Sequence, residues 1–159
     1  KLYIYNAVDI NSRFQFSHAF ESANSKNTVK FMKKLETVYP GESGITTVQT
    51  DNGSEYLGAF DQYLKTKHIK HLFIYFTDPR INGYVERSNR TLQEEFINNH
   101  LNLLATNINA FNSKLIDYLI WYNTKRVHKG LNNLSPIDFL KTLSGVSNVC
   151  NSYISLTNR

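Results

Sequence analysis

The stretch Thr50-Asp51-Asn52-Gly53-Ser54-Glu55-Tyr56 follows a β-branched run, Ile45 to Thr50, which predicts a strand that ends at Asp51. Downstream, Asn82-Gly83-Tyr84-Val85-Glu86-Arg87 leads into a segment predicted to be helical from Gly83 to about Asn99. Thirty-four residues separate Asp51 from Glu86. Ligands bind where neighbouring strands end in open α/β sheets, so these two carboxylates are candidates for one site.

A third candidate carboxylate, Asp9, ends the first predicted strand, Leu2 to Asp9. Asn11-Ser12 predicts a turn, and Phe14 to Phe20 predicts a second strand that completes a hairpin. Each carboxylate also has an ordinary structural explanation. Asp9 can open the turn, Asp51-Asn52-Gly53 can be a hairpin turn, and Glu86 can be a surface partner of Arg90.

The remaining pattern alternates helices with strands and predicts a mixed sheet covered by helices in a single domain, residues 1–159. We expect the part from about 107 to 159 to be a helical extension of that domain. Residues 21–26 are predicted to form either a short strand or a loop. The other predicted elements are a helix from N-cap Ser25 to about Tyr39 with the stripe Val29, Met32, Leu35 and Val38, a helix at 59–67, a strand at 69–76, a polar loop at 77–82, a helix at 107–124 and a last helix from Ser135-Pro136.

Composition narrows the class of protein. Hydrophobic residues make up 41% of the 159, which is typical of a globular chain. The net charge of +5 favours a polyanionic partner, because Lys and Arg attract phosphates whatever the sequence. The single cysteine, Cys150, excludes a disulfide within the chain and is expected to be inert. No stretch has the pattern of a signal peptide or membrane span, so we expect a cytoplasmic protein.

Taken together, the motifs resemble the integrase core family, which comprises retroviral integrases and bacterial insertion-sequence transposases. The family's signature is an Asp, a second Asp in an Asp-Asn-Gly context, and a Glu about 35 residues later in Asn-Gly-x-x-Glu-Arg. Asp9, in Val8-Asp9-Ile10-Asn11-Ser12-Arg13, resembles the first Asp. Trp121-Tyr122-Asn123-Thr124-Lys125-Arg126-Val127-His128 resembles the transposases' Tyr-Asn-x-x-Arg-Pro-His block. Ser88 and Val127 depart from the pattern, which has a large apolar residue and a Pro there.

The resemblance implies a ribonuclease H-like α/β fold, a five-stranded mixed sheet flanked by α-helices. It implies that Asp9, Asp51 and Glu86 hold two Mg²⁺ or Mn²⁺ ions, which would cleave phosphodiesters and transfer a 3′-hydroxyl in DNA integration or transposition. Asn52 and Glu55 would support the ligands. Basic or polar residues expected to contact DNA are Arg80, Arg87, Arg90, Lys125, Arg126, His128 and Lys129.

The expected partners are DNA and further copies of the chain, as a homodimer or higher oligomer in a prokaryotic cell. A separate DNA-recognition domain is expected outside this chain, and no membrane partner is expected. Two alternatives stay open. One is a ribonuclease H-like two-metal nuclease without strand transfer. The other is a catalytically inactive DNA-binding domain derived from a transposase.

Overall fold

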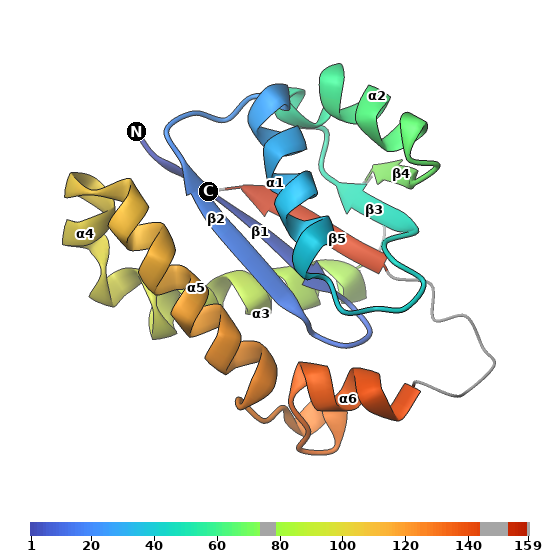
Figure 1. The fold of residues 1–159 in the computed structure, drawn as a ribbon, viewed down its shortest axis with the longest axis vertical. Coiled ribbons are helices and arrows are strands. Elements are labelled where there is room, and N and C mark those ends of the chain that lie inside the picture. Colours follow the sequence, from blue (N-terminus) through green and yellow to red (C-terminus); the bar gives the residue numbers. More distant parts are fainter. Residues whose placement is uncertain (74–78, 144–152, 159) are drawn as a thin grey trace.

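A five-stranded mixed sheet in the order β2-β1-β5-β3-β4 forms the centre of the computed structural model (Figure 1). The structure describes residues 1–73, 79–143 and 153–158, and for residues 79–82 and 153–158 it describes the backbone but not the side chains. The strands are β1 (Tyr3–Asp9), β2 (Gln15–Phe20), β3 (Thr47–Thr50), β4 (Lys70–Phe73) and β5 (Tyr153–Asn158). The predicted fold class, a five-stranded mixed sheet with helices around it, is confirmed.

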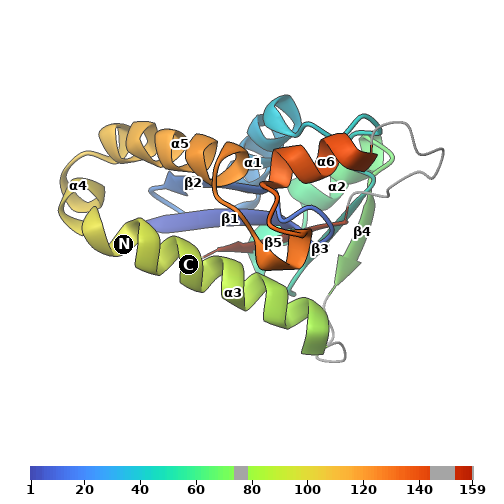
Figure 2. The same ribbon diagram turned by 90° about the horizontal axis from the view of Figure 1, so that it is seen from below.

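Helices cover both faces of this sheet. Figure 2 shows α1, α5 and α6 on one side and α3 on the other. The helices are α1 (Ser25–Val38), α2 (Ala59–Thr66), α3 (Pro79–Glu95), α4 (Leu101–Thr106), α5 (Ile108–Thr124) and α6 (Pro136–Leu143), with short 3-10 turns η1 (Ser54–Tyr56), η2 (Ile97–Asn99) and η3 (Lys129–Leu131). No helix among residues 1–73, 79–143 and 153–158 is long and apolar enough to cross a membrane.

The strand β5 differs from the predicted helical extension over about 107–159. It lies between β1 and β3, antiparallel to β1 and parallel to β3. Ile-Ser-Leu-Thr at 154–157 alternates branched residues with small polar ones, a strand pattern that was not predicted from the sequence. Pairing on both edges fixes this short segment, so tertiary context determines its structure. Cys150 lies outside the described residues.

The hairpin of β1 and β2 forms as predicted, with Val8 opposite Gln15 and Tyr3 opposite Phe20. The chain reverses through Arg13, whose φ is +62°, in the left-handed region. Side chains alternate between the two faces of β1. Tyr5 packs on Phe31 of α1, whereas Asn6 contacts α3.

Two helix starts differ from the sequence prediction. The N-cap of α1 is Asn24, whose side chain accepts a hydrogen bond from Asn27 N at 2.9 Å, and Ser25 is the first helical residue. Residues 21–24, left open before, form a bend rather than a strand. The helix α3 begins at Pro79, so 79–82 form its first turn instead of a loop, which suits proline because that position lacks an amide partner. Thr77 and Asp78 lie outside the described residues.

The edge strand β2 has its unpaired backbone groups covered by two asparagines of α5. Asn112 accepts from Ala19 N at 2.8 Å and donates to Ala19 O at 3.0 Å. Asn123 makes the same pair of bonds with Gln15, at 2.9 and 2.8 Å. Both asparagines are buried, so they satisfy strand groups that neither a neighbouring strand nor water reaches.

We predict that Asn112→Leu lowers the free energy of unfolding by about 2–4 kcal/mol, because two buried backbone groups of Ala19 lose their partners. Urea denaturation measures this change. Ser113→Ala, at an exposed position on the same helix, should change stability by less than about 0.5 kcal/mol. Equal effects of the two substitutions would contradict the role assigned to Asn112.

Candidate active site

Asp51 follows β3 directly and is exposed. Its Oδ1 accepts a hydrogen bond from Gly53 N at 2.9 Å, so the predicted turn exists and orients the carboxylate. The preceding residue, Thr50, has its Oγ1 2.9 Å from Nε2 of His71 on β4. The Thr50–His71 contact and the turn therefore both restrict the end of β3, where Asp51 lies.

Beside Asp51, the segment through η1 brings a second carboxylate close. A Cβ on Gly53 would stand 2.7 Å from Oε1 of Glu55, so the Glu55 carboxylate lies against the glycine backbone. The buried hydroxyl of Tyr56 has no hydrogen-bond partner among the described residues. Burial raises the pKa of Tyr56, and the charges of Asp51 and Glu55 raise it further. Asn52 is exposed at this turn.

Glu86 is an exposed residue of α3, and the position of this helix is set by Asn6 of β1. The Asn6 amide donates to Ser88 Oγ at 3.2 Å and to Asn89 Oδ1 at 2.8 Å. It accepts from Ser17 Oγ at 2.7 Å and from Gln15 Nε2 at 2.9 Å. All four hydrogen bonds are buried, so they attach the turn of α3 next to Glu86 to one point on the sheet.

The strand registers place Asp51 and Asn6 at the same position along the direction of the strands. Asn6 pairs with Thr157 of β5, and β3 runs parallel to β5 with Gln49 beside Ser155. Continuing that register, Asp51 is level with Thr157 and hence with Asn6, two strands away. The structure thus brings Asp51 and the Glu86 helix to the same region of the sheet.

Asp9 is not in that region, and the prediction that it joins Asp51 and Glu86 is wrong for this structure. Asp9 is level with Val48, through Ile154 between them, because β1 runs opposite to β3. This places it about 14 Å from Asp51 in the plane of the sheet, from three residues along the strand and two strand spacings across. Its side chain also points to the α1 face, away from α3.

The role of Asp9 is structural. The buried carboxylate accepts hydrogen bonds from Asn11 N at 3.0 Å, Ser12 Oγ at 2.6 Å and the Tyr39 hydroxyl at 3.0 Å. It thereby orders the hairpin turn, which is the ordinary explanation considered from the sequence. The described residues contain no group of three or more His, Cys, Asp or Glu side chains that could hold a metal ion.

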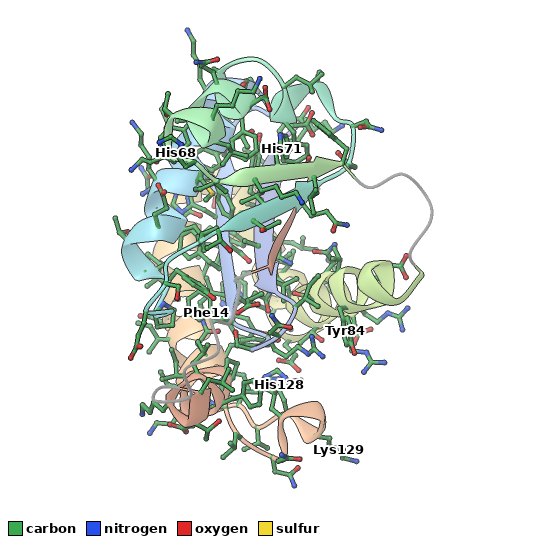
Figure 3. The ribbon with its side chains drawn as sticks, turned by 90° about the vertical axis from the view of Figure 1, so that its right-hand side faces the viewer. Phe14, His68, His71, Tyr84, His128 and Lys129 are labelled. Carbon is green, nitrogen blue, oxygen red and sulfur yellow. The ribbon has the colours of Figure 1, made fainter. Side chains whose placement is uncertain are left out.

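The expected DNA-contacting residues fall into two sets. Arg87, Arg126, His128 and Lys129 line one cavity of about 560 Å³, together with Arg13 and Tyr84, which the sequence reading had not assigned to DNA. Arg90 and Lys125 are exposed and do not line it. The side chain of Arg80 lies outside the described residues. Figure 3 shows Tyr84, His128 and Lys129 on the same side of α3, with β3 and β4 on the other side.

The comparisons with known proteins agree with the sheet topology. Residues 67–136 match the sequence family described as "Integrase core domain". A protein described as "Putative integrase ORF3", from Spiroplasma virus SpV1-C74, is 30% identical over 159 aligned residues, covering 91% of this chain. Both matches are thus similarities to integrase proteins.

Solved structures of integrase catalytic cores have the same fold as this chain. The catalytic core domain of BIV integrase superposes with a TM-score of 0.69 at 20% identity, covering 87% of this chain and 86% of that one. The HTLV-2 integrase catalytic core domain, solved in complex with magnesium in a trimeric form, gives 0.66 at 19% identity, covering 86% and 84%. The fold is therefore ribonuclease H-like. The chain spans 43% of the length of the viral relative.

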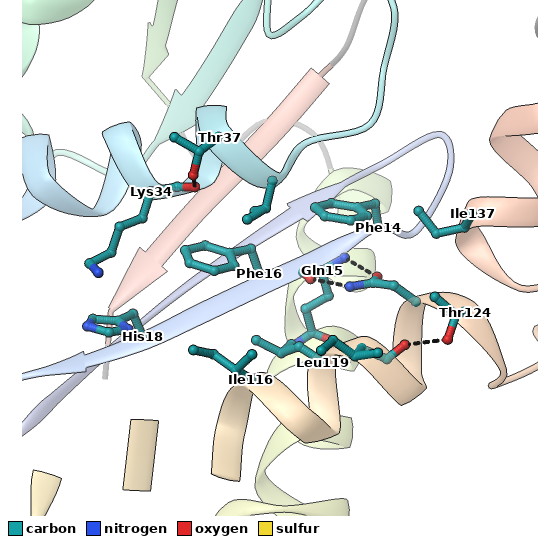
Figure 4. Close-up of a pocket in the computed structure, with 13 residues that line it drawn as sticks. Phe14, Gln15, Phe16, His18, Lys34, Thr37, Ile116, Leu119, Thr124 and Ile137 are labelled. Carbon is teal, nitrogen blue, oxygen red and sulfur yellow. Dashed lines mark hydrogen bonds between the residues drawn. The ribbon is translucent and has the colours of Figure 1, made fainter. Parts of the chain in front are cut away.

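A second, apolar cavity of about 350 Å³ lies on the opposite face, between β2, α1, α5 and α6 (Figure 4). Phe14, Phe16 and Leu119 form its floor, and the half-exposed Ile120 forms part of its rim. His18 and Lys34 lie at one end. Burial, followed by the charge of Lys34, lowers the pKa of His18 to about 4, so this imidazole is neutral at pH 7.

We predict that Asp9→Ala lowers the free energy of unfolding by about 2–4 kcal/mol, since Ser12 and Tyr39 lose a buried charged acceptor. Asp51→Ala should cost less than about 1 kcal/mol, because Asp51 is exposed and accepts a single hydrogen bond from a turn amide. Urea denaturation of both variants measures the difference. A large cost for Asp51 together with a negligible one for Asp9 would contradict the structural assignment.

Proposed function

We propose that this chain forms the catalytic core of a DNA integrase or transposase, which cleaves phosphodiesters and transfers a 3′-hydroxyl to DNA. The observation that carries the proposal is the convergence of Asp51 and the Glu86 helix on one region of an integrase-type sheet. The relationship to the viral integrase supports the reaction class, although the chain spans less than half of that protein. The setting we propose is the cytoplasm of a prokaryotic cell, on DNA.

Asp51 and Glu86 fit a hard divalent cation such as Mg²⁺ or Mn²⁺. Both are exposed carboxylates, and neither has a salt bridge among the residues that the structure describes. Such cations prefer carboxylate oxygens and keep several waters. When bound, two ions would stabilise the attacking and leaving oxygens of the phosphoryl transfer. Because Asp9 is on the other face, a third protein ligand must come from elsewhere than Asp9.

The chain's own contribution is to position these two carboxylates. Asp51 is held by its turn and by the neighbouring Thr50–His71 contact, and Glu86 is held through the anchoring of Ser88 and Asn89 on Asn6. Both elements are fixed by the fold before any substrate arrives. Such preorganisation reduces the cost of gathering like charges at the moment of reaction.

We expect Asp51→Asn and Glu86→Gln each to lower the rate of DNA strand transfer by roughly 100-fold or more, since each removes charge stabilisation of several kcal/mol. The measurement is a strand-transfer assay with pre-cut DNA ends in Mn²⁺. Mn²⁺ binding, followed by the relaxation of water protons, should weaken in the same variants. Glu94→Gln, at an exposed position on the same helix, is the matched control and should retain activity.

Asp9→Asn supplies the sharpest test of the revised site. At a temperature where circular dichroism shows it folded, it should retain activity within a few-fold of the parent. If it behaves like Asp51→Asn, the structural role assigned to Asp9 fails. If Asp51→Asn leaves strand transfer unchanged, the proposed function itself fails.

A second candidate function is DNA binding without chemistry, and the position of Asp9 favours it specifically. With two carboxylates at the site, the described residues lack the triad that the family signature implies. In that case the parent protein would bind DNA but give neither shortened nor joined products. A nuclease without strand transfer would give shortened products only.

We also propose that the protein self-associates and that its DNA-recognition domain lies outside this chain. The half-exposed Val38, Ile116 and Ile120 border the apolar cavity, so α5 both lines a groove and presents apolar side chains to a second copy.

We predict that Ile120→Lys shifts the protein from dimer to monomer in analytical ultracentrifugation, because a charge would be buried in the interface. Leu101→Lys, also at an exposed apolar position but on α4, should leave the dimer intact. A monomeric parent protein, or equal effects of the two variants, would contradict this interface.

A further inference from the structure

The basic cavity beside α3 is assembled from four separate parts of the chain. Val8 of β1 and Arg13 of the hairpin form one wall, and Tyr84 and Arg87 of α3 form another. The end of α5 and the segment 127–130 close it. Residues this far apart in the sequence meet here because Asn6 anchors α3 directly beneath β1. The cavity, about 560 Å³ in volume, is large enough for a phosphodiester group with its adjoining sugar.

Among the residues that the structure describes, the charges that line the cavity are all positive. Arg13, Arg87, Arg126 and Lys129 contribute four cations, and none of the described lining residues is a carboxylate. Arg126 is paired with Glu95, through contacts of 2.7, 3.1 and 3.2 Å. Among the described residues, the other three cations have no carboxylate partner. Holding like charges around one cavity costs free energy, which an anion within it would offset.

Arg13 is the most constrained of these cations. Its backbone adopts the left-handed conformation, and its guanidinium carbon lies 3.7 Å from the centre of the Tyr84 ring. The guanidinium lies over the face of the Tyr84 ring, and this contact restricts the directions of its N–H groups. One of them, Nη1, is buried with no hydrogen-bond partner among the described residues. A fixed guanidinium with a free donor suits bidentate contact with phosphate oxygens.

His128 provides a second unused polar atom at the same cavity. Its Nε2 is buried without a partner among the described residues, and its ring packs edge-on against Tyr122 at 5.1 Å. Burial lowers the pKa of His128 to about 4, and the charges of Arg126 and Arg13 add to the effect. The imidazole is therefore neutral at pH 7. In the tautomer protonated at Nε2, it can donate a hydrogen bond to an anion.

We propose that this cavity binds one backbone phosphate of the DNA strand, with Arg13 and Arg87 as its ligands and His128 Nε2 as a hydrogen-bond donor. The proposal rests on the proposed function, because it takes DNA as the ligand. It adds a site for a non-reacting phosphate.

The geometry of α3 separates this phosphate from the reacting one. Tyr84, Arg87, Ser88 and Thr91 line the cavity, and at about 100° per residue Glu86 lies on the opposite flank of the helix. A phosphate in the cavity and one near Glu86 would thus be about one helix diameter apart, ~10–12 Å. The cavity would hold the strand to one side of the reacting bond and fix its path across α3.

The test is DNA binding by the full protein, measured by fluorescence anisotropy with a short labelled duplex over a series of NaCl concentrations. Arg87→Gln should weaken binding roughly tenfold and reduce the slope of log K against log salt by about one. Arg90→Gln removes the same charge from an exposed position of α3 outside the cavity and should have a clearly smaller effect. Equal effects of these two variants would overturn the proposal in favour of a general surface attraction.

Arg13→Lys separates geometry from charge. It keeps the positive charge but loses the stacked, forked guanidinium, so binding should weaken several-fold. Unchanged binding by Arg13→Lys, with the fold confirmed by circular dichroism, would also overturn the proposal. Inorganic phosphate, titrated while the Arg13 Nε–H signal is followed by NMR, should shift that signal and compete with the duplex. A signal shifted by phosphate but not by DNA would identify an anion site that DNA does not use.

Failure of this proposal is distinguishable from failure of the proposed function. Duplex binding reports on the cavity and strand transfer reports on the carboxylates, so the two assays test the two proposals separately. If DNA binding depends on Arg13 and Arg87 but the parent protein transfers no strands, the phosphate-site proposal stands and the proposed catalytic function fails. If Arg87→Gln transfers strands as efficiently as the parent at limiting DNA concentration, the phosphate-site proposal alone fails.

Discussion

The Asn6 amide is the interaction on which the functional side of this protein depends. It is buried on a central strand, and its four hydrogen bonds use all of its donors and acceptors. Two reach β2 and two reach α3, so one side chain fixes both the hairpin register and the position of the helix. Ser88, where the family pattern has a large apolar residue, is explained by this contact. An apolar side chain there would leave an amide donor of Asn6 without that partner.

The misassignment of Asp9 shows which information a linear motif lacks. The sequence correctly indicates that Asp9 ends a strand, as Asp51 does. It does not give the direction of one strand relative to the other. The strands β1 and β3 run in opposite directions, since β5 between them is antiparallel to β1 and parallel to β3. Nor does spacing to a distant helix show which face of the strand a residue occupies. Asn6 and Asp9 differ by three positions, so they point to opposite faces, and only the contacts with α3 and Tyr39 show which is which.

Local physical chemistry accounts for what could be predicted. The Asp51 turn, the hairpin and the α5 helix follow from turn residues, β-branched runs and apolar periodicity within about ten residues of each other. The integrase-type fold could be expected from the several different motifs that lie along the chain. The central place of β5 and the basic cavity could not be predicted, because both depend on contacts between segments about seventy or more residues apart. Arg13 illustrates this: in the sequence it is part of a turn, and only the fold sets its guanidinium on Tyr84.

The two flanks of α3 carry different groups, Glu86 on one and the cavity residues Tyr84 and Arg87 on the other, as helix geometry requires. Successive residues of a helix point about 100° apart, so Glu86 and Arg87 serve different surfaces although they are adjacent. Ser88 and Asn89 face the sheet and hold the helix in place. Any motion of α3 that displaced Glu86 would therefore displace Tyr84 and Arg87 from the cavity as well. Anchoring at Asn6 thus keeps the Glu86 carboxylate and the basic cavity at a fixed separation. A DNA strand bound in the cavity would therefore lie at a fixed distance from Glu86.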